Sequence, residues 1–345
     1  MAKHELWELR QMQSLPLAAK VRMTENRIRD WVREFGEDGV YVSFSGGKDS
    51  TVLLHIVRSM YPDIEAVFVN TGLEYPEIQR FVKTFDNVTI LRPKMRFDEV
   101  IKKYGYLLIS KEVSQRLHEF RRNPNSNKKK WNADGEYGKG SRYSLQKWVP
   151  MRECSIPVSH MCCAVMKKKP AKEYEKQTGK RPILATMADE SVQRITTWLR
   201  YGCNAFDGKR PRSTPMSFWT EQDVLQYIKQ EGIQIASVYG DVVHEVDPDQ
   251  MRIEDYGVEG CGTDKLVTTG CSRTGCIFCA FGCHLEKGES RFERLKKTHP
   301  RQYEYCIGGG EYNEDGIWKP NKQGLGMGHV FDELNKIYGD GFIKY

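Results

Sequence analysis

The sequence predicts an α/β fold whose core is a parallel sheet with helices on both faces. Three short apolar runs, at residues 40–44, 64–70 and 88–91, have the length and composition of buried strands. Apolar residues recur at helical spacing before the first run, over residues 22–35, and after it, over residues 51–60. Strands that alternate with helices form βαβ units, whose strands are parallel and whose helices cover the sheet.

The pattern changes at residues 121–148, where aliphatic residues are few and Asn, Gly, Ser and Lys are many. We interpret this basic insert as a long loop, either a solvated one or a lid or arm that binds a polyanion. A helix near residues 170–178, a strand at 182–187 and a helix at 221–230 resume the core pattern. The predicted organisation is a helical segment 1–37, a central domain 38–235 that contains the insert 121–148, and a Cys-rich C-terminal module 236–345.

Composition restricts the class of protein. The chain has 345 residues, of which 39% are hydrophobic, enough for a sizeable core. No run approaches the roughly 18 apolar residues of a membrane span, and the first residues lack a secretory signal, so we expect a cytoplasmic protein with no membrane partner. Its net charge of +7 suits an anionic substrate. In a reducing cytosol the ten cysteines indicate metal ligation before disulfides.

A phosphate-binding loop follows the first predicted strand, and its residues are Ser43, Phe44, Ser45, Gly46, Gly47, Lys48, Asp49 and Ser50. At a strand-to-helix junction, backbone N–H groups and the helix dipole converge on an anion. We expect Gly46 and Gly47 to let the backbone approach phosphate, and Lys48 to be a solvent-facing cation. Asp49 either caps the helix or helps to hold Mg²⁺. The loop lacks the GxxxxGK[ST] spacing of a Walker A motif.

The segment SGGKDS resembles the loop of the PP-loop ATP pyrophosphatases, and later elements resemble the phosphoadenosine phosphosulfate (PAPS) reductase-like branch of adenine nucleotide α-hydrolases. These elements are NTGLEYPE at 70–77, ADESVQR at 188–194 and PMSFWTEQDV at 215–224. The resemblance implies a Rossmann-like (HUP-type) sheet of five parallel strands with ATP at its carboxyl edge. It also implies further nucleotide contacts, from Asn70, Thr71, Gly72, Glu190 and Ser191.

Arg194 has two interpretations. It can form a surface ion pair with Glu190, four residues earlier on the same helix. We favour an anion-binding role, because a guanidinium suits phosphate or sulfate oxygens. Arg210 and Arg212 could act in the same way from a loop, although for them we favour ordinary solvated positions.

The cysteines form two groups, Cys162–Cys163 and a CxxC element at Cys276 and Cys279. A CC pair with a distant CxxC resembles the arrangement in assimilatory adenylyl-sulfate reductases, which implies a 4Fe-4S cluster held by these four thiolates. Zn²⁺ or redox-active thiols are the alternatives. A local ligand set would instead draw on Cys271, Cys283 or Cys306. We expect Cys154, Cys203 and Cys261 to be small buried hydrophobes.

The leading hypothesis is an enzyme that cleaves ATP to AMP and pyrophosphate and adenylates an acceptor in sulfur transfer, with Lys48, Asp49 and Arg194 as catalytic residues. An alternative is a PAPS or adenylyl-sulfate reductase with Cys306 as nucleophile. The sequence departs from the family pattern here, because Cys306 lacks the neighbouring His of the reductases' Glu-Cys-Gly-(Leu/Ile)-His motif. A third alternative is a nucleotide-binding subunit of a nucleic-acid complex. A nucleic acid, a sulfur-donor protein and a second copy of the chain all stay open as partners.

Overall fold

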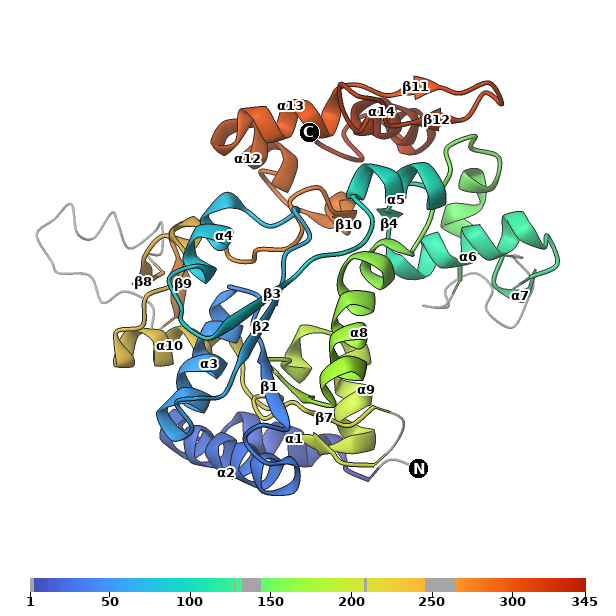
Figure 1. Ribbon diagram of the computed structural model, residues 1–345. Helices are drawn as coiled ribbons and strands as arrows, with labels where there is room; N and C mark the ends of the chain where they lie inside the picture. Colours follow the sequence, from blue (N-terminus) through green and yellow to red (C-terminus); the bar gives the residue numbers. More distant parts are fainter. Residues whose placement is uncertain (1–2, 127, 132–143, 208–209, 246–264) are drawn as a thin grey trace, which may run out of the picture. The chain divides into compact units, whose positions relative to one another are not determined.

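The computed structural model describes residues 3–126, 128–131, 144–207, 210–245 and 265–345 (Figure 1). The chain comprises two compact units. Unit 1 consists of Met1–Asn70, Glu74–Arg92 and Ala171–Gly275, and unit 2 of Thr71–Leu73, Pro93–Pro170 and Cys276–Tyr345. The boundaries predicted after residues 37 and 235 rest on composition and stay a prediction.

Unit 1 contains a six-stranded sheet with the order β3-β2-β1-β5-β7-β6. The strands are β1 (Val40–Ser43), β2 (Ala66–Val69), β3 (Val88–Leu91), β5 (Arg181–Leu184), β6 (Asn204–Ala205) and β7 (Arg212–Ser213). All neighbours pair in parallel except β6, which is antiparallel to β7. The predicted α/β fold with five parallel strands is therefore confirmed. The edge strand β6 was not predicted, because two residues cannot display an alternating pattern.

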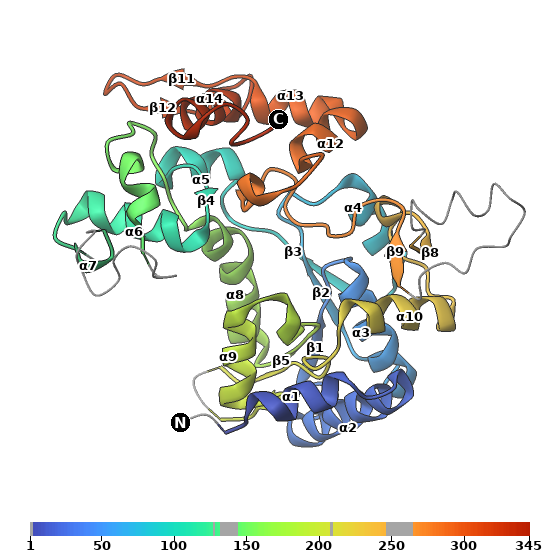
Figure 2. The same cartoon turned by 180° about the vertical axis from the view of Figure 1, so that it is seen from behind.

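Helices lie on both sides of this sheet. In Figure 1 and in the reverse view of Figure 2, α3 and α10 lie on one side, and α8 and α9 on the other. The helices of unit 1 are α1 (Leu6–Gln13), α2 (Leu17–Phe35), α3 (Lys48–Met60), α4 (Pro76–Val82), α9 (Val192–Tyr201) and α10 (Glu221–Glu231), together with most of α8 (Lys169–Thr178). Short turns η3 (Ala188–Glu190) and η4 (Ser237–Tyr239) and the hairpin β8 (Val242–His244) with β9 (Leu266–Thr268) complete it.

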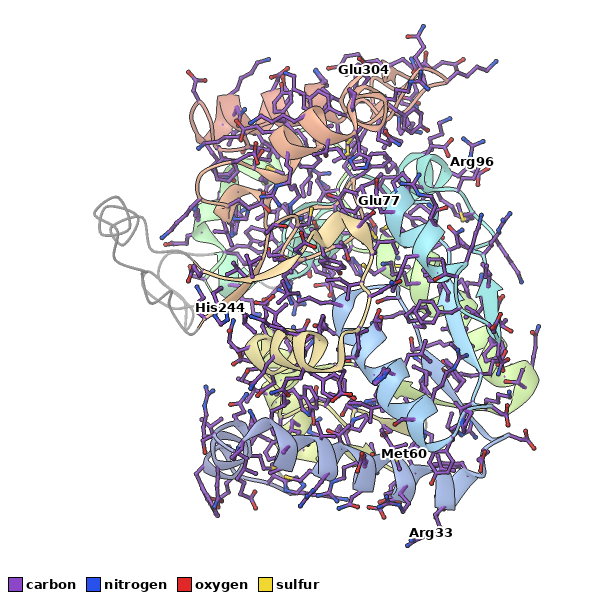
Figure 3. The ribbon with its side chains drawn as sticks, turned by 90° about the vertical axis from the view of Figure 1, so that its left-hand side faces the viewer. Arg33, Met60, Glu77, Arg96, His244 and Glu304 are labelled. Carbon is purple, nitrogen blue, oxygen red and sulfur yellow. The ribbon has the colours of Figure 1, made fainter. Side chains whose placement is uncertain are left out.

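The start of α3 differs from the prediction. The helix begins at Lys48 rather than at residue 51, so the second half of the phosphate loop is the first helical turn. Gly47 is the N-cap, with φ −78° and ψ 156°, the extended geometry that cap residues adopt. Met60, at the other end of α3, lies with Arg33 of α2 at the lower edge of unit 1 in Figure 3. The N-terminus of α3 is therefore the end that meets the carboxyl end of β1.

Unit 2 is built mainly from helices around a short parallel pair, β4 (Leu108–Ile109) with β10 (Ala280–Phe281). This pair joins two segments that are far apart in the sequence. The other elements are α5 (Phe97–Tyr104), α6 (Lys111–Arg122), α7 (Lys128–Trp131), η1 (Gln146–Arg152), η2 (Ala164–Lys168), η5 (Cys283–Leu285), α12 (Arg291–Thr298), α13 (Pro300–Ile307), the hairpin β11 (Glu311–Tyr312) with β12 (Trp318–Lys319), and α14 (Met327–Tyr338). Among the described helices, none is long and apolar enough to cross a membrane.

The basic insert is only partly a loop. Its described residues include the end of α6, all of α7 and the start of η1, whereas residues 127 and 132–143 lie outside the described chain. Arg121, at its first position, donates hydrogen bonds to the carbonyls of Met151, Cys154 and Ile156 at 3.2, 2.6 and 2.6 Å. Such a guanidinium satisfies buried backbone carbonyls, so Arg121 holds unit 2 together rather than facing a polyanion.

Candidate nucleotide site and cysteine cluster

The phosphate loop connects the carboxyl end of β1 to the N-terminus of α3. Phe44, the first residue after β1, is 1% exposed and meets the ring of Phe85 edge-on, with centroids 5.0 Å apart. This contact anchors the loop on unit 1. The first N–H groups of a helix have no intrahelical partner, so the start of α3 offers donors where the sequence predicted a phosphate.

Gly46 shows why the loop needs glycine. Its φ is +70°, and a Cβ placed on it would lie 2.8 Å from Cγ2 of Ile78 and 2.8 Å from Cγ2 of Val82. A side chain here would both strain the backbone and collide with α4. The tight turn of the loop therefore depends on this residue.

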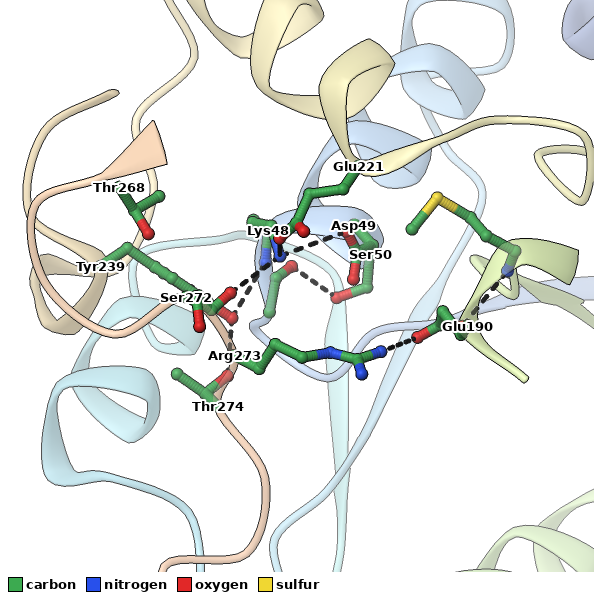
Figure 4. A network of polar contacts seen from close by, with 12 residues as sticks. Lys48, Asp49, Ser50, Glu190, Glu221, Tyr239, Thr268, Ser272, Arg273 and Thr274 are labelled. Atoms are coloured by element: carbon green, nitrogen blue, oxygen red, sulfur yellow. Dashed lines mark hydrogen bonds and ion pairs between the residues drawn. The ribbon is translucent and has the colours of Figure 1, made fainter. Parts of the chain in front are cut away.

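Two serine hydroxyls tie the loop together. The Oγ atoms of Ser45 and Ser50 are 3.0 Å apart, and the backbone N–H of Ser45 donates to Ser50 Oγ at 3.1 Å (Figure 4). Ser50 Oγ also donates to the carbonyl of Gly47 at 2.9 Å, and the N–H of Gly47 donates to Ser45 Oγ at 3.3 Å. These bonds fix the loop conformation, and both hydroxyls are thereby engaged within the protein.

Lys48 is buried, which corrects the expectation of a solvent-facing cation. Its side chain is 4% exposed, and its Nζ lies 3.0 Å from a carboxylate oxygen of Glu221 and donates to the carbonyl of Ser272 at 2.9 Å (Figure 4). Its position on the first helical turn, rather than on a protruding loop, explains the burial. Burying an ammonium requires such partners, because unpaired charge is costly away from water.

Asp49 follows Lys48 on the first turn of α3. Burial raises the pKa of its carboxyl above the ordinary value, the Lys48 ammonium lowers it, and the Glu221 carboxylate raises it. Its Oδ1 has no hydrogen-bond partner among the described residues, although the Lys48 Nζ lies 3.8 Å away. That separation is an ion contact rather than a hydrogen bond. A carboxylate oxygen with spare acceptor capacity is the kind of group that binds a hard cation such as Mg²⁺.

Arg194 forms the ion pair with Glu190 that was the first of its two interpretations. Its guanidinium contacts the carboxylate of Glu190, and Arg273 contacts the other oxygen of the same carboxylate at 2.8 Å. Burial lowers the pKa of Arg194, the nearby charge of Arg273 lowers it further, and that of Asp49 raises it. One carboxylate thus holds two guanidinium groups, and with Asp49 the cluster contains two positive and two negative charges.

Tyr239 of η4 and the segment after β9 contribute groups that the sequence did not indicate. The Tyr239 hydroxyl accepts the backbone N–H of Lys48 at 3.3 Å and lies 2.6 Å from Thr274 Oγ1. Together with the carbonyl of Ser272 and the side chain of Arg273, these groups surround the start of α3 (Figure 4). Tyr239 therefore contacts one of the loop amides, and the segment after β9 contacts the loop cation.

The other residues predicted to contact the nucleotide belong to different elements of the chain. Asn70 follows β2, and its N–H donates to the carbonyl of Leu91 at 2.9 Å. In unit 2, Thr71 Oγ1 accepts from the N–H of Leu73 at 3.2 Å, and Gly72 has a φ of +75°. Ser191 is the N-cap of α9 and accepts from the N–H of Arg194 at 3.3 Å. Their contacts with a nucleotide stay predictions.

Four predicted cysteine ligands come together in unit 2. Burial raises the pKa of the Cys162 thiol, and the neighbouring thiols of Cys276, Cys163 and Cys279 raise it further. Burial also raises the pKa of Cys279, while Arg291 and Lys167 lower it and Cys163 raises it. These mutual effects place the CC pair and the CxxC element in one cluster. In the described residues, however, no three His, Cys, Asp or Glu side chains are arranged to hold a metal ion as they stand.

Local structure around the cluster is unusual. Cys163 caps the π-helix η2, and helical turns of this kind are rare and often found at functional sites. The Arg291 guanidinium donates to the carbonyl of Cys279 at 2.9 Å and pairs with Glu286 at 2.6 Å. Thiolates gather negative charge, so a cation at this distance from the CxxC turn suits a four-thiolate centre.

The remaining cysteines have other surroundings. Cys271 is buried in unit 1, and in unit 2 the Cys283 thiol donates to the carbonyl of Ala280 at 3.0 Å. In unit 1, Cys203 is buried and accepts from Ser217 Oγ at 3.3 Å, which fits a small core residue. Cys154 is half-buried rather than buried. Cys261 lies outside the described residues.

The sequence profile of the phosphoadenosine phosphosulfate reductase domain matches residues 39–281. The chain belongs to this family. It is 26% identical over 263 residues to sulfate adenylyltransferase subunit 2 of Shewanella frigidimarina, covering 71% of this chain and 77% of that protein. It is 27% identical over 229 residues to adenosine 5'-phosphosulfate reductase of Geobacillus kaustophilus, covering 66% and 78%.

A PAPS reductase of Candida auris, solved as a phosphate complex, is similar at a TM-score of 0.37 and 12% identity, over 76% of this chain and 98% of that one. The PAPS reductase-family assignment does not depend on this weak likeness. It rests on the profile match, and the parallel sheet of unit 1 agrees with the fold that the sequence motifs implied.

Within this PAPS reductase family member, Cys306 is part of the core. The side chain is 0% exposed, its Sγ lies 3.5 Å from Met327 Sδ, and burial raises its pKa. A nucleophilic cysteine needs access and a readily formed thiolate. The described surroundings of Cys306 provide neither.

Sequence reasoning missed Tyr239, Ser272, Arg273 and Thr274. Of these, Arg273 left a faint signal, as a cation in the short polar segment CSRTGC between two cysteines. Glu221 stood inside the recognised 215–224 element but was not assigned a role. Their contacts with the loop arise from tertiary structure, since about 190 to 225 residues separate the partners.

Proposed function

We propose that this PAPS reductase-family protein cleaves ATP between the α- and β-phosphates, releasing pyrophosphate and adenylating an acceptor. The observation that carries the proposal is the buried Lys48 at the N-terminus of α3, beside the loop amides and the Arg194–Glu190–Arg273 cluster. A preorganised cation and helix N-terminus stabilise charge that develops on a departing pyrophosphate.

Each polar group has a role in this proposal. Lys48 and the N–H groups at the start of α3 bind the phosphates, and Arg194 binds the α-phosphate or the acceptor. Asp49 would hold Mg²⁺, which when bound neutralises phosphate charge. To bind the phosphates, the ammonium of Lys48 must exchange its contacts with Glu221 and Ser272 for phosphate oxygens. Phosphate oxygens accept hydrogen bonds from an ammonium at least as strongly.

The cysteine cluster is the proposed site of a 4Fe-4S centre, with Zn²⁺ as the alternative. Cys162, Cys163, Cys276 and Cys279 would be the ligands, because their thiols share one cluster in unit 2. An iron–sulfur cluster would supply either electrons or a sulfur-handling site. Since two relatives are named as a sulfate adenylyltransferase subunit and a phosphosulfate reductase, we place the protein in sulfur metabolism and expect a partner subunit.

The products of ATP cleavage test the proposal directly. Purified protein is incubated anaerobically with Mg²⁺ and α-³²P-labelled ATP, and the labelled product is separated by chromatography. We expect labelled AMP, whereas labelled ADP would contradict the proposal. Lys48→Met keeps the buried stem and removes the charge, so we expect the rate to fall at least a hundredfold. Lys229→Met is the matched control, because Lys229 is exposed on α10 and contacts His244.

A reductase is the second candidate, favoured by the similarity to adenosine 5'-phosphosulfate reductase. Its test is sulfite release from adenylyl sulfate or PAPS with thioredoxin as reductant. We expect none, because the Cys306 thiol is buried against Met327. Sulfite formation at about 1 per second or faster, abolished by Cys306→Ser, would make the reductase the leading function.

A further inference from the structure

Unit 1 contains a cavity of about 260 Å³ at the carboxyl ends of β5 and β7, beneath α9. Its polar lining includes Arg194, Arg212, Trp198 and four hydroxyl residues, Thr186, Thr197, Thr214 and Ser217. Of the described residues that line it, none is Asp or Glu. The cavity therefore has a positive wall, and no lining carboxylate would repel an anion.

Arg212 is the cation that distinguishes this cavity. Its guanidinium carbon lies 5.3 Å from the centre of the Tyr201 ring, and no ion pair joins it to a carboxylate of the described residues. Arg210, two residues earlier, differs sharply, because it forms two 2.7 Å hydrogen bonds with Glu175 outside the cavity. The solvated loop position predicted for Arg212 is thus corrected, since the residue lies on β7, is half-buried and lines this cavity.

Trp198 adds an unused donor. The residue is 3% exposed, and its indole N–H has no hydrogen-bond partner among the described residues. A buried N–H without a partner costs about 1–3 kcal/mol, so such groups in native proteins call for an explanation. Trp198 lines the cavity, so its indole signal can report on a ligand that binds there.

The rest of the lining and the volume limit the ligand. Leu184, Ala188, Ala205 and the ring of Tyr201 add apolar surface to the lining. The volume lies just below the roughly 300–1,000 Å³ of typical ligand pockets. The space suits one ring or a short chain with an anionic head, and it is too small for a macromolecule or a whole nucleotide.

We propose that this cavity binds the acceptor of the adenylation and that the acceptor is a small organic acid. The inference rests on the proposed function. Arg212 would bind the carboxylate, and Arg194 joins the cavity to the phosphate-loop cluster through Glu190. A carboxylate oxygen then forms a bond to the α-phosphorus. The bond from that phosphorus to the bridging oxygen breaks, and its electron pair leaves with pyrophosphate.

Binding is tested without nucleotide on the full-length protein. The seven tryptophans are labelled with ¹⁵N at the indole, and Trp198→Phe assigns the signal of Trp198. The probes are benzoate, benzyl alcohol and benzylamine, which share one ring and differ in charge. We expect benzoate alone to shift the Trp198 indole signal in a saturable way. Arg212→Gln should weaken benzoate binding at least tenfold, and Arg210→Gln should leave it unchanged.

The outcomes separate this inference from the proposed function. Unshifted signals of the other six indoles establish that Arg212→Gln is folded. Equal shifts with benzyl alcohol, or an Arg212→Gln protein that binds benzoate normally, would overturn the anion site. Displacement of benzoate by ATP would assign the cavity to the nucleotide and overturn the acceptor role. Selective benzoate binding without AMP formation would uphold the anion site but refute adenylation, and AMP formation without benzoate binding would leave only the proposed function standing.

Discussion

The phenolic oxygen of Tyr239 accepts the backbone N–H of Lys48 at 3.3 Å, so a side chain some 190 residues away occupies a loop amide that a phosphate oxygen would use. The same hydroxyl lies 2.6 Å from Thr274 Oγ1. This loop amide is therefore occupied by a contact within the protein, and a nucleotide must compete with that contact.

Tyr239→Phe tests this competition. Removing the hydroxyl should lower the free energy of unfolding by about 1 kcal/mol and raise the affinity for ATP, because the Lys48 N–H is released for phosphate. Calorimetric titration with ATP and urea unfolding measure the two effects. Tyr227→Phe is the control, since that hydroxyl contacts His55 Nδ1 at 3.0 Å, away from the loop. A tenfold loss of ATP affinity in Tyr239→Phe would instead make the phenol a nucleotide contact.

Gly46→Ala should be more destabilising than an ordinary glycine substitution. The left-handed backbone costs about 1–2 kcal/mol for a residue with a Cβ, and the contacts at 2.8 Å with Ile78 and Val82 add about 1–3 kcal/mol. Gly179→Ala isolates the backbone effect, because its φ is +75° and no atom lies within 4 Å of the added carbon. Equal losses of unfolding free energy in the two variants would show that the loop tolerates the contact.

Ligand substitutions test the cysteine cluster. Cys163→Ser, Cys276→Ser and Cys279→Ser should each lose the metal centre, because each removes one thiolate of the proposed four. Cys154→Ser should keep it, since Cys154 is a half-buried thiol beside the carbonyls bound by Arg121. Iron, sulfide and zinc are assayed after anaerobic purification. A Cys163→Ser protein with full occupancy of the metal centre and a Cys283→Ser protein without the centre would favour the local ligand set. An unmodified protein that contains neither iron nor zinc would refute both ligand sets.

Glu65 gives unit 1 a predictable dependence on pH. Burial opposes its charged form, but hydrogen bonds from Lys180, Thr89 and Tyr174 outweigh burial and lower the pKa of the carboxyl. Because the pKa of Glu65 is lower in the folded state than the unfolded-state value of 4.5, its ionised carboxylate stabilises the fold at pH values above 4.5. This stabilisation is lost as the pH falls through the folded-state pKa. Glu65→Gln should therefore unfold more easily at pH 7, by about 1–3 kcal/mol, with a difference that shrinks below pH 4.5. A difference independent of pH would mean that the charge is not responsible.

The sequence predicted the sheet well because buried strands and amphipathic helices carry their own periodicity. Residues 40–44 and 88–91 lie within one residue of β1 and β3. Periodicity says nothing about which distant side chains meet. The burial of Lys48 by Glu221 and Ser272, and the pairing of Arg273 with Glu190, required the fold. The resemblance to adenylyl-sulfate reductases identified the four clustered cysteines. Arg212 was predicted to be a solvated loop residue, and only the structure shows that it lines a cavity.

The order of the chain through the two units has a consequence for synthesis on the ribosome. The polypeptide passes from one unit to the other five times, and β1 reaches its second neighbour, β5, only 90 residues after β3 ends. At about 5–20 residues per second, the nascent sheet keeps one edge of β1 unpaired for roughly 5 to 20 seconds. Cells that translate this message slowly, or that lack chaperones able to shield such an edge, should accumulate aggregated product during its synthesis.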